Sequence, residues 1–309
     1  MTSMNKRLLL LLILVFFQKS FCQDHGIIVA NLEMNTKDPH FGMAIGSNGT
    51  VLVTSFKTAK NGRVIMDGVD PVLGLYEGQI ESNGEITDLQ PVAISKSEDI
   101  EHIVSATYSP DGKKLYVTTK YGNRKNKPKG TFKETNLHIE VAEYMADEGW
   151  SHFKVLPFCD PKFSYAHPTI SADGKTMYFI SSMKGQANQY TRGQSDIYKV
   201  TIDAEGNYGE PENVGANVNS YAKELFPYIS KNNVLYYASN KPGGLGGYDI
   251  YKSEMDSEGH FGIAERLPKP INSLENDICF VLIDGKRGYV TSKRKNGKGD
   301  DDIYYFVMD

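Results

Sequence analysis

The sequence has few of the residues that hold a small secreted protein together or carry it across a membrane. Its 309 residues include three cysteines, one tryptophan and a single long apolar run, which lies at the N-terminus. Cys22 lies five residues after that run, in a segment that we expect to be cleaved off, so Cys159 and Cys279 alone would remain, and two cysteines 120 positions apart do not make a disulfide framework. We expect two separately buried thiols rather than a disulfide bond between them.

The apolar run has the pattern of a secretory signal peptide. Lys6 and Arg7 precede residues 8–17, and small residues stand at positions −3 and −1 of a cleavage site after Cys22. The run is shorter than the roughly 20 residues that a membrane-spanning helix needs. We therefore predict a leader over residues 1–22, export to the periplasm or the outer surface, and no membrane-spanning segment after cleavage. The alternative is a lipoprotein acylated at Cys22.

No excess of positive charge is present in the rest of the chain. The net charge is −4, and removal of a leader with three cations and no acid brings it to −7. An acidic chain of this kind is not a general nucleic-acid binder. We assign residues 23–309 to one domain.

Helical periodicity is also lacking, and in its place the chain repeats one unit five times. Each unit has a short strand, a polar turn and a second strand rich in Tyr, Phe and Val. Asp-Gly and Asn-Gly in these turns supply the positive φ angles of tight hairpins. The turns lie at residues 47–49, 109–112, 171–174, 230–233 and 283–285, and the second strands at 51–55, 115–119, 177–181, 235–239 and 288–292.

A third strand follows a variable loop in every unit. In the last three units it begins with Asp-Ile-Tyr, at residues 196–198, 249–251 and 302–304, with a spacing of 53. Weaker equivalents are residues 75–76 and 138–141. Fourth strands are expected at residues 211–219 and 267–272. Four strands in each unit of roughly 50–60 residues is the pattern of a β-propeller, so we predict an all-β fold with five four-stranded blades.

The fifth unit ends at its third strand, and its fourth strand is expected from the N-terminus. Residues 29–35 read like residues 214–219, which follow the third strand of the third unit. A strand from the start of the chain that completes the last blade closes the ring and leaves no unpaired sheet edge.

Two segments resemble a known family. Residues 109–117 (Ser-Pro-Asp-Gly-x-x-Leu-Tyr-Val) and 239–251 (Ser-Asn-Lys-Pro-Gly-Gly-Leu-Gly-Gly-Tyr-Asp-Ile-Tyr) are similar to the WD40-like, TolB-type propeller repeat of Bacteroidota envelope proteins. The resemblance covers residues 38–309. It implies a propeller used for protein contacts at the envelope, without the OmpA-like domain that many relatives carry, and it implies no particular reaction.

Motifs that would indicate catalysis or cofactor binding are scarce. The Ser-x-Asp-Gly turns differ from a sialidase Asp-box, which has a residue between Asp and Gly and a following aromatic. The glycines at 243–247 lack the Gly-Lys-Ser/Thr of a phosphate-binding loop, and a hairpin loop is the simpler interpretation. We expect no catalytic residue, metal or cofactor from sequence.

Histidine and aspartate clusters also have structural interpretations. His40, His102 and His167 stand near the starts of successive first strands, and we interpret them as equivalent packing residues rather than a metal site. Residues 300–302 are three consecutive aspartates, which suit Ca²⁺. Neutralisation by Lys295 and Lys298 is the interpretation we prefer.

The loops between second and third strands carry more positive charge than packing requires. The loops between second and third strands all leave the same face, and they carry a net charge of +11 over residues 57–71, 120–136, 183–195, 240–248 and 293–301. Such a face would attract anionic partners. The candidate binding residues on it are Arg124, Lys125, Lys127, Lys129, Tyr190, Arg192, Lys293 and Arg294.

These observations favour binding over catalysis. The predicted function is an exported propeller that binds an envelope protein or an anionic glycan. The alternative is a secreted carbohydrate-active propeller, a glycosidase or lyase of the sialidase type, with paired carboxylates in the central channel. A third possibility, which only the family resemblance supports, is a subunit of an export or motility apparatus.

Overall fold

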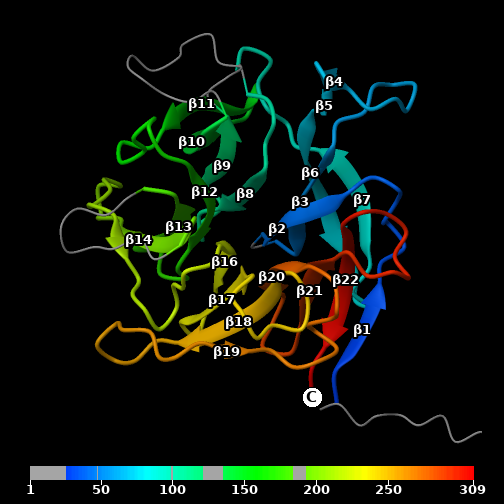
Figure 1. The fold of residues 1–309 in the computed structure, drawn as a ribbon. Helices are drawn as coiled ribbons and strands as arrows, with labels where there is room; N and C mark the ends of the chain where they lie inside the picture. The colour runs from blue at the N-terminus through cyan, green and yellow to red at the C-terminus, as the bar shows by residue number, and fades with distance from the viewer. Residues whose placement is uncertain (1–25, 47, 99, 121–134, 184–192) are drawn as a thin grey trace, which may run out of the picture.

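The computed structural model describes residues 26–46, 48–98, 100–120, 135–183 and 193–309, and every regular element within these ranges is a β-strand. Five four-stranded antiparallel sheets stand around a central axis, as Figure 1 shows. The five-bladed propeller predicted from the repeats is therefore confirmed. In the described ranges there is no helix long and apolar enough to cross a bilayer.

Each blade runs from an inner strand at the axis to an outer strand at the rim. Blade 1 contains β2 (His40–Ile45), β3 (Thr50–Phe56), β6 (Leu73–Ile80) and β7 (Ile86–Pro91), and blade 2 contains β8 (Ser105–Tyr108), β9 (Lys114–Lys120), β10 (Leu137–Met145) and β11 (Gly149–Val155). Blade 3 contains β12 (Tyr165–Ile170), β13 (Thr176–Ser181), β14 (Asp196–Thr201) and β15 (Glu212–Asn213).

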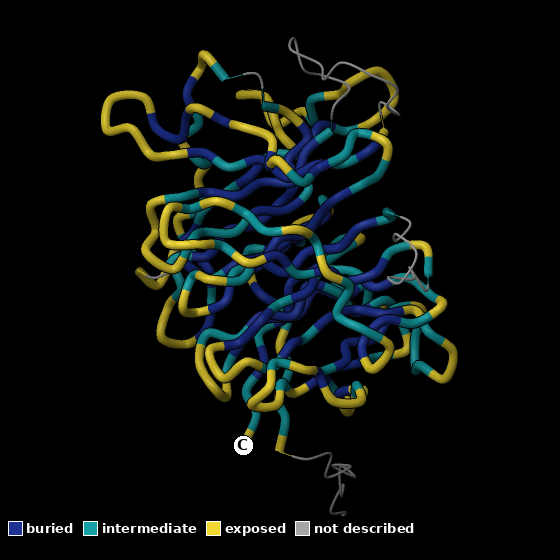
Figure 2. Tube along the Cα trace, turned by 90° about the vertical axis from the view of Figure 1, so that its left-hand side faces the viewer, coloured by how far each residue is buried: buried dark blue, intermediate teal, exposed yellow. Residues whose placement is uncertain are grey.

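Blade 4 contains β16 (Glu224–Ile229), β17 (Val234–Ser239), β18 (Asp249–Glu254) and β19 (Glu265–Arg266). Blade 5 contains β20 (Asp277–Leu282), β21 (Arg287–Ser292), β22 (Asp302–Val307) and, from the other end of the chain, β1 (Ile28–Asn31). A small hairpin of β4 (Met66–Asp67) and β5 (Asp70–Pro71) projects from the loop between β3 and β6. Clusters of buried side chains are shared by neighbouring blades. Figure 2 shows the buried stretches of the chain in the interior and the exposed ones on the outside.

The closing strand predicted from the N-terminus is present. β1 pairs antiparallel with β22, with Ile28 opposite Val307 and Asn31 opposite Tyr304. Beyond β1, Leu32 is buried and its N–H bonds to the carbonyl oxygen of Ile303 at 3.2 Å. The chain thus enters blade 5 as its outermost strand before it builds blade 1, and the ring is closed by paired backbone.

Asparagines that follow the fourth strands explain why residues 29–35 resemble residues 214–219 in sequence. The side chain of Asn272 accepts the N–H of Ile250 at 2.6 Å and donates to its carbonyl oxygen at 2.9 Å. Asn219 brackets Ile197 in blade 3, and Asn35 brackets Ile303 in blade 5 in the same way. Each pair of bonds satisfies a third-strand peptide group at the point where the fourth strand has ended.

The fourth strands of blades 3 and 4 are shorter than predicted. β15 covers two residues of the expected 211–219, and β19 ends before the expected 267–272 begins. In blade 4 the cause is proline, because Pro268 and Pro270 have no N–H to donate to a ladder. Leu267 makes one more bond to Ile250, and the chain then turns so that Asn272 reaches the same residue.

The glycine-rich loop before β18 is a hairpin connection, as expected, and it packs against the next blade. Asp249, the first residue of β18, accepts the N–H groups of Leu245 at 2.7 Å and of Gly246 at 3.3 Å. A Cβ at Gly246 would overlap the carbonyl oxygen of Glu275, which belongs to the connection into blade 5. We therefore interpret Gly246 as a residue that allows two backbones to approach closely, and not as part of a phosphate-binding loop.

Both remaining cysteines are free and buried, as predicted. Cys159 packs with the aromatic core between blades 2 and 3, and Cys279 lies on β20 at the central axis. Burial raises the pKa of the Cys159 thiol to about 12, so this sulfur stays a protonated, unreactive thiol at neutral pH.

Candidate functional site

A cavity of about 630 Å³ opens at one mouth of the central channel. Its lining includes the turns that join first and second strands, among them Gly49, Pro110, Ala172, Lys231 and Ile283. The loops between second and third strands leave the opposite ends of the same strands. The cavity therefore lies on the face opposite the predicted basic loops.

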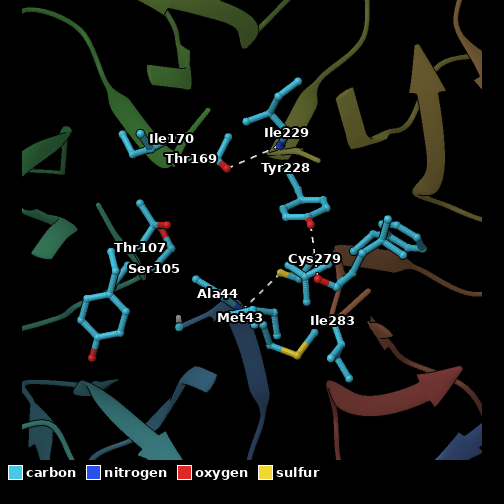
Figure 3. Close-up of a pocket in the computed structure, with 18 of the residues that line it drawn as sticks. Met43, Ala44, Ser105, Thr107, Thr169, Ile170, Tyr228, Ile229, Cys279 and Ile283 are labelled. Atoms are coloured by element: carbon cyan, nitrogen blue, oxygen red, sulfur yellow. Dashed lines mark hydrogen bonds between the residues drawn. The ribbon is translucent and has the colours of Figure 1, made fainter. Parts of the chain in front are cut away.

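The walls are apolar side chains with hydroxyl groups between them. Figure 3 shows residues from all five inner strands directed at a common space, including Met43, Ile170 and Ile229. The hydroxyls are bonded within the protein: Thr169 accepts the N–H of Ile229 at 3.5 Å, and Tyr228 donates to the carbonyl oxygen of Leu282 at 3.3 Å. This combination of an apolar surface and few polar groups is typical of a ligand pocket.

The floor consists of one residue from each inner strand, at equivalent positions in the repeat: Gly42, Ser105, His167, Phe226 and Cys279. In four blades the inner strand bulges here, and its register with the second strand shifts. β8 has no such shift, so Ser105 lies in a regular strand. A bulge re-aims a side chain, and four equivalent bulges bring their residues to the axis.

Contacts among these residues, and one with Phe41, link the inner strands beneath the cavity. The N–H of Gly42 donates to Sγ of Cys279 at 3.2 Å, and the rings of His167 and Phe226 lie 3.7 Å apart. Phe226 of blade 4 also packs edge-on against Phe41 of blade 1 at 6.5 Å. Blades 1 and 4 are not neighbours around the ring, so this last contact crosses the axis.

The floor carries backbone strain. His167, Phe226 and Cys279 have φ angles of 55°, 47° and 51°, a region that residues with a side chain rarely adopt. Each such residue costs of the order of 1 kcal/mol or more, and strained residues cluster at binding and catalytic sites. Three at equivalent positions around one cavity distinguish this floor from the rest of the inner strands.

Ser105 and His167, which are 62 residues apart in sequence, meet at the floor. Nδ1 of His167 lies 3.1 Å from Oγ of Ser105, and the Ser105 hydroxyl donates to Oγ1 of Thr118 at 3.0 Å. An activated serine would donate its proton to the imidazole instead. Burial lowers the pKa of His167 to about 3, which leaves a neutral ring and a weak base. The pair is therefore not a nucleophile and its base.

Carboxylates are sparse at the cavity. Glu81 is the single acid in the described lining, which also includes Lys231 and Arg287. Arg287 is paired with Asp284, with Nε 2.8 Å from Oδ2. Glycoside hydrolysis uses two carboxyl groups about 5–10 Å apart. This lining does not supply the second carboxyl group that the predicted carbohydrate-active alternative requires.

Two of the eight predicted binding residues lie in described parts of the chain, and both are paired. Lys293 contacts Asp300 at 2.8 Å. Arg294 donates to the carbonyl oxygens of Pro270 and Ile271 and stacks over Tyr304. Arg124, Lys125, Lys127, Lys129, Tyr190 and Arg192 lie outside the described residues, so the basic face stays a prediction.

The three histidines are not equivalent packing residues, which corrects the sequence-based interpretation. His40 is the first residue of β2, His102 precedes β8, and His167 occupies the bulge of β12. Their partners differ: Nε2 of His102 lies 3.4 Å from Asp67, whereas His167 contacts Ser105. Among the described residues no group of three or more His, Cys, Asp or Glu side chains could hold a metal ion.

Two of the three consecutive aspartates are paired with a lysine, but not with either of the lysines we expected. Lys293 pairs with Asp300 and, at 3.7 Å, with Asp301. Asp302 is buried and accepts N–H groups of the preceding loop, as Asp249 does in blade 4. Lys298 instead donates to the carbonyl oxygens of Leu32 and Glu33. Its ammonium group thus ties the loop to the segment that follows the closing strand.

Acidification is expected to destabilise the fold through His167. The unfolded chain has a histidine pKa of 6.5 and the folded chain one of about 3, so between these values only the unfolded state gains a proton. The free energy of unfolding then falls as the pH falls, by about 2.5 kcal/mol from pH 7 to about pH 4.5. Urea denaturation at both pH values measures this fall in the free energy of unfolding. In the His167→Gln variant the fall should be smaller than in the natural chain by about 2.5 kcal/mol. Equal losses in the two chains would contradict it.

Comparisons with known proteins identify the fold and no closer relationship. No family model matches the sequence, and no curated protein matches it. Among solved structures, β-1,2-mannobiose phosphorylase from Listeria innocua is similar with a TM-score of 0.52 and 12% identity, over 92% of this chain and 90% of that one. At that identity the similarity establishes a shared fold alone.

Two TolB structures are also similar. TolB from Acinetobacter baumannii has a TM-score of 0.43 and 15% identity over 88% of this chain, which spans 55% of that protein. A putative TolB from Agrobacterium tumefaciens has a TM-score of 0.48 and 15% identity, over 87% of this chain and 78% of that one. The chain is a five-bladed β-propeller, as its repeats predicted, closed by its own N-terminal strand.

Proposed function

We propose that the chain is an exported, non-enzymatic binding module and that the channel cavity is where it holds a partner protein of the cell envelope. The observation that carries the proposal is the cavity itself: a space of about 630 Å³, lined by all five blades, with Phe226 and His167 in contact at its floor. Its size is that of a site for one or a few side chains.

The chemistry of the lining supports binding over turnover. The described walls consist mainly of apolar groups and hydroxyls, and Glu81 is the single acid among them. The hydroxyl of Ser105 donates its proton to Oγ1 of Thr118. Apolar surface at a concave, strained site gains free energy when a partner covers it. The leader predicted over residues 1–22 and the resemblance of the repeats to the TolB type support an envelope location.

The test is capture of partners from envelope extracts by the mature chain and two matched variants. Ala172→Trp places a large ring at the cavity rim, and Ala59→Trp places the same ring on the opposite face; both alanines are exposed, so both variants should fold. We expect Ala172→Trp to lose at least tenfold in capture and Ala59→Trp to retain it. Because the cavity is apolar, capture should persist at high salt.

A further variant distinguishes binding in the cavity from binding on the basic face. Glutamine at positions 124, 125, 127 and 129 removes four positive charges from one loop. If capture is lost in this chain and in high salt while Ala172→Trp binds normally, the basic face is the binding surface and the cavity proposal fails. Release of sugar from envelope glycans by the purified chain would instead support the carbohydrate-active alternative.

A further inference from the structure

The hydrogen bonds at the cavity floor determine which nitrogen of His167 carries its proton. A serine hydroxyl has one proton to donate, and that of Ser105 goes to Oγ1 of Thr118. Oγ of Ser105 is then the acceptor in its 3.1 Å contact with Nδ1 of His167. Thr118 also accepts the backbone N–H of His167 at 3.0 Å, which fixes the position of the residue. The ring proton therefore sits on Nδ1.

The other nitrogen of the ring is left as a hydrogen-bond acceptor. Because burial lowers the pKa of His167 to about 3, the ring is neutral at physiological pH and Nε2 carries a lone pair. The described residues make no hydrogen bond to Nε2, and this atom is not among the buried polar atoms without a partner, so it is open to the space of the cavity although the residue as a whole is buried. One face of the ring packs on Phe226, and the residue belongs to the cavity lining.

An acceptor that is open to the cavity loses its contact with water when an occupant covers it, so Nε2 selects what can fill the space above it. An occupant with an N–H or O–H group satisfies Nε2, whereas a purely apolar occupant of the same shape leaves it desolvated, at a cost of about 1–3 kcal/mol. A charged occupant is disfavoured by the apolar walls. Aromatic rings already form part of the floor, because Phe226 packs edge-on against Phe41.

We propose that the cavity receives an uncharged aromatic side chain of a partner protein, the indole of a tryptophan or the phenol of a tyrosine, whose N–H or O–H donates to Nε2 of His167. This inference rests on the proposed function and names the group that the site recognises. His167 then selects an occupant that can donate a hydrogen bond. Ser105 and Thr118 hold its imidazole in position.

The test uses two small probes that differ in one proton. Indole has an N–H donor, and 1-methylindole has nearly the same shape without it. Titrations of the isotope-labelled mature chain, followed by NMR, give the affinity of each probe, and the nitrogen shifts of His167 report its tautomer directly. We expect the Nδ1–H tautomer, roughly tenfold tighter binding of indole, and a change in the Nε2 shift with indole alone.

His167→Phe is the matched variant, because the equivalent position of blade 4 already holds phenylalanine at a similar φ. In this variant the two probes should bind equally. Equal binding of both probes to the natural chain, or an Nε2–H tautomer, would overturn the inference while leaving the cavity as a binding site. Absence of any shift at the cavity with either probe would overturn it as well, and the capture experiment with Ala172→Trp would decide the proposed function separately.

Discussion

A chain that starts at Lys37, without the closing strand and the segment after it, is expected not to fold cooperatively. It lacks the ladder between β1 and β22, the buried side chain of Leu32, and the two bonds from Asn35 to Ile303. Burial of a leucine alone contributes about 2–3 kcal/mol. The total loss should exceed about 5 kcal/mol, which is comparable with the whole stability of many domains. Circular dichroism and thermal denaturation measure it.

A synthetic peptide of residues 26–36 provides the control. Because it contains all of the missing contacts, it should restore a cooperative transition when added to the truncated chain, in proportion to its concentration. A peptide with alanine in place of Leu32 and Asn35 should not. If the truncated chain melts at the same temperature as the full one, the N-terminal strand does not close the ring and this part of the account is wrong.

Gly246→Ala is expected to be strongly destabilising, although it adds a single methyl group to a loop of blade 4. The new Cβ would overlap the backbone carbonyl oxygen of Glu275, and a backbone cannot move aside as a flexible side chain does. The same close approach recurs between Gly193 and Ala222 and between Gly299 and Thr36. We expect a loss of about 3 kcal/mol in the free energy of unfolding.

Gly285→Ala is the matched control for this variant. Gly285 also lies in a turn, but a Cβ there meets nothing within 4 Å and its φ is not in the positive range. Its replacement should change the free energy of unfolding by no more than about 0.5 kcal/mol. Urea denaturation of both variants gives the comparison, and similar losses in the two would contradict the interblade contact.

The fold could be predicted from the sequence because its signals repeat. Asp-Ile-Tyr recurs every 53 residues, and in each copy the aspartate begins the third strand. Asn35 was recognisable as a copy of Asn219 because the residues before both asparagines are similar. In the structure both side chains bond to a third-strand residue. The bounds of the fourth strands were less predictable, since Pro268 and Pro270 interrupt the ladder within a segment that otherwise reads as a strand.

The candidate site could not be predicted in the same way, because each blade contributes a single floor residue. Those five residues are of five types, Gly42, Ser105, His167, Phe226 and Cys279, and they form no motif along the chain. One signal was available. When the repeats are aligned on their turns, this is a position where the units differ, and in a repeat protein such a position on the inner strand faces the axis.

The charge that the loops present to a partner could not be predicted from the sequence either. A count of loop charges treats every lysine and arginine as available to a partner, but pairing depends on the fold. Lys293 is held by Asp300, and Arg294 lies between backbone carbonyls and Tyr304 with a relative exposure of 17%. A loop that is strongly basic in composition can thus present little free charge.

Photo-crosslinking in intact cells tests the central claim, that the channel cavity is the binding site, most directly. Benzoylphenylalanine replaces Thr107 on the cavity wall, Ala59 on the opposite face, or Asn126 in the most basic loop, one position in each chain. We expect a protein adduct of defined mass from position 107 and none from position 59 or 126. Adducts from position 126 alone, with none from position 107, would contradict it and move the binding site to the basic loops.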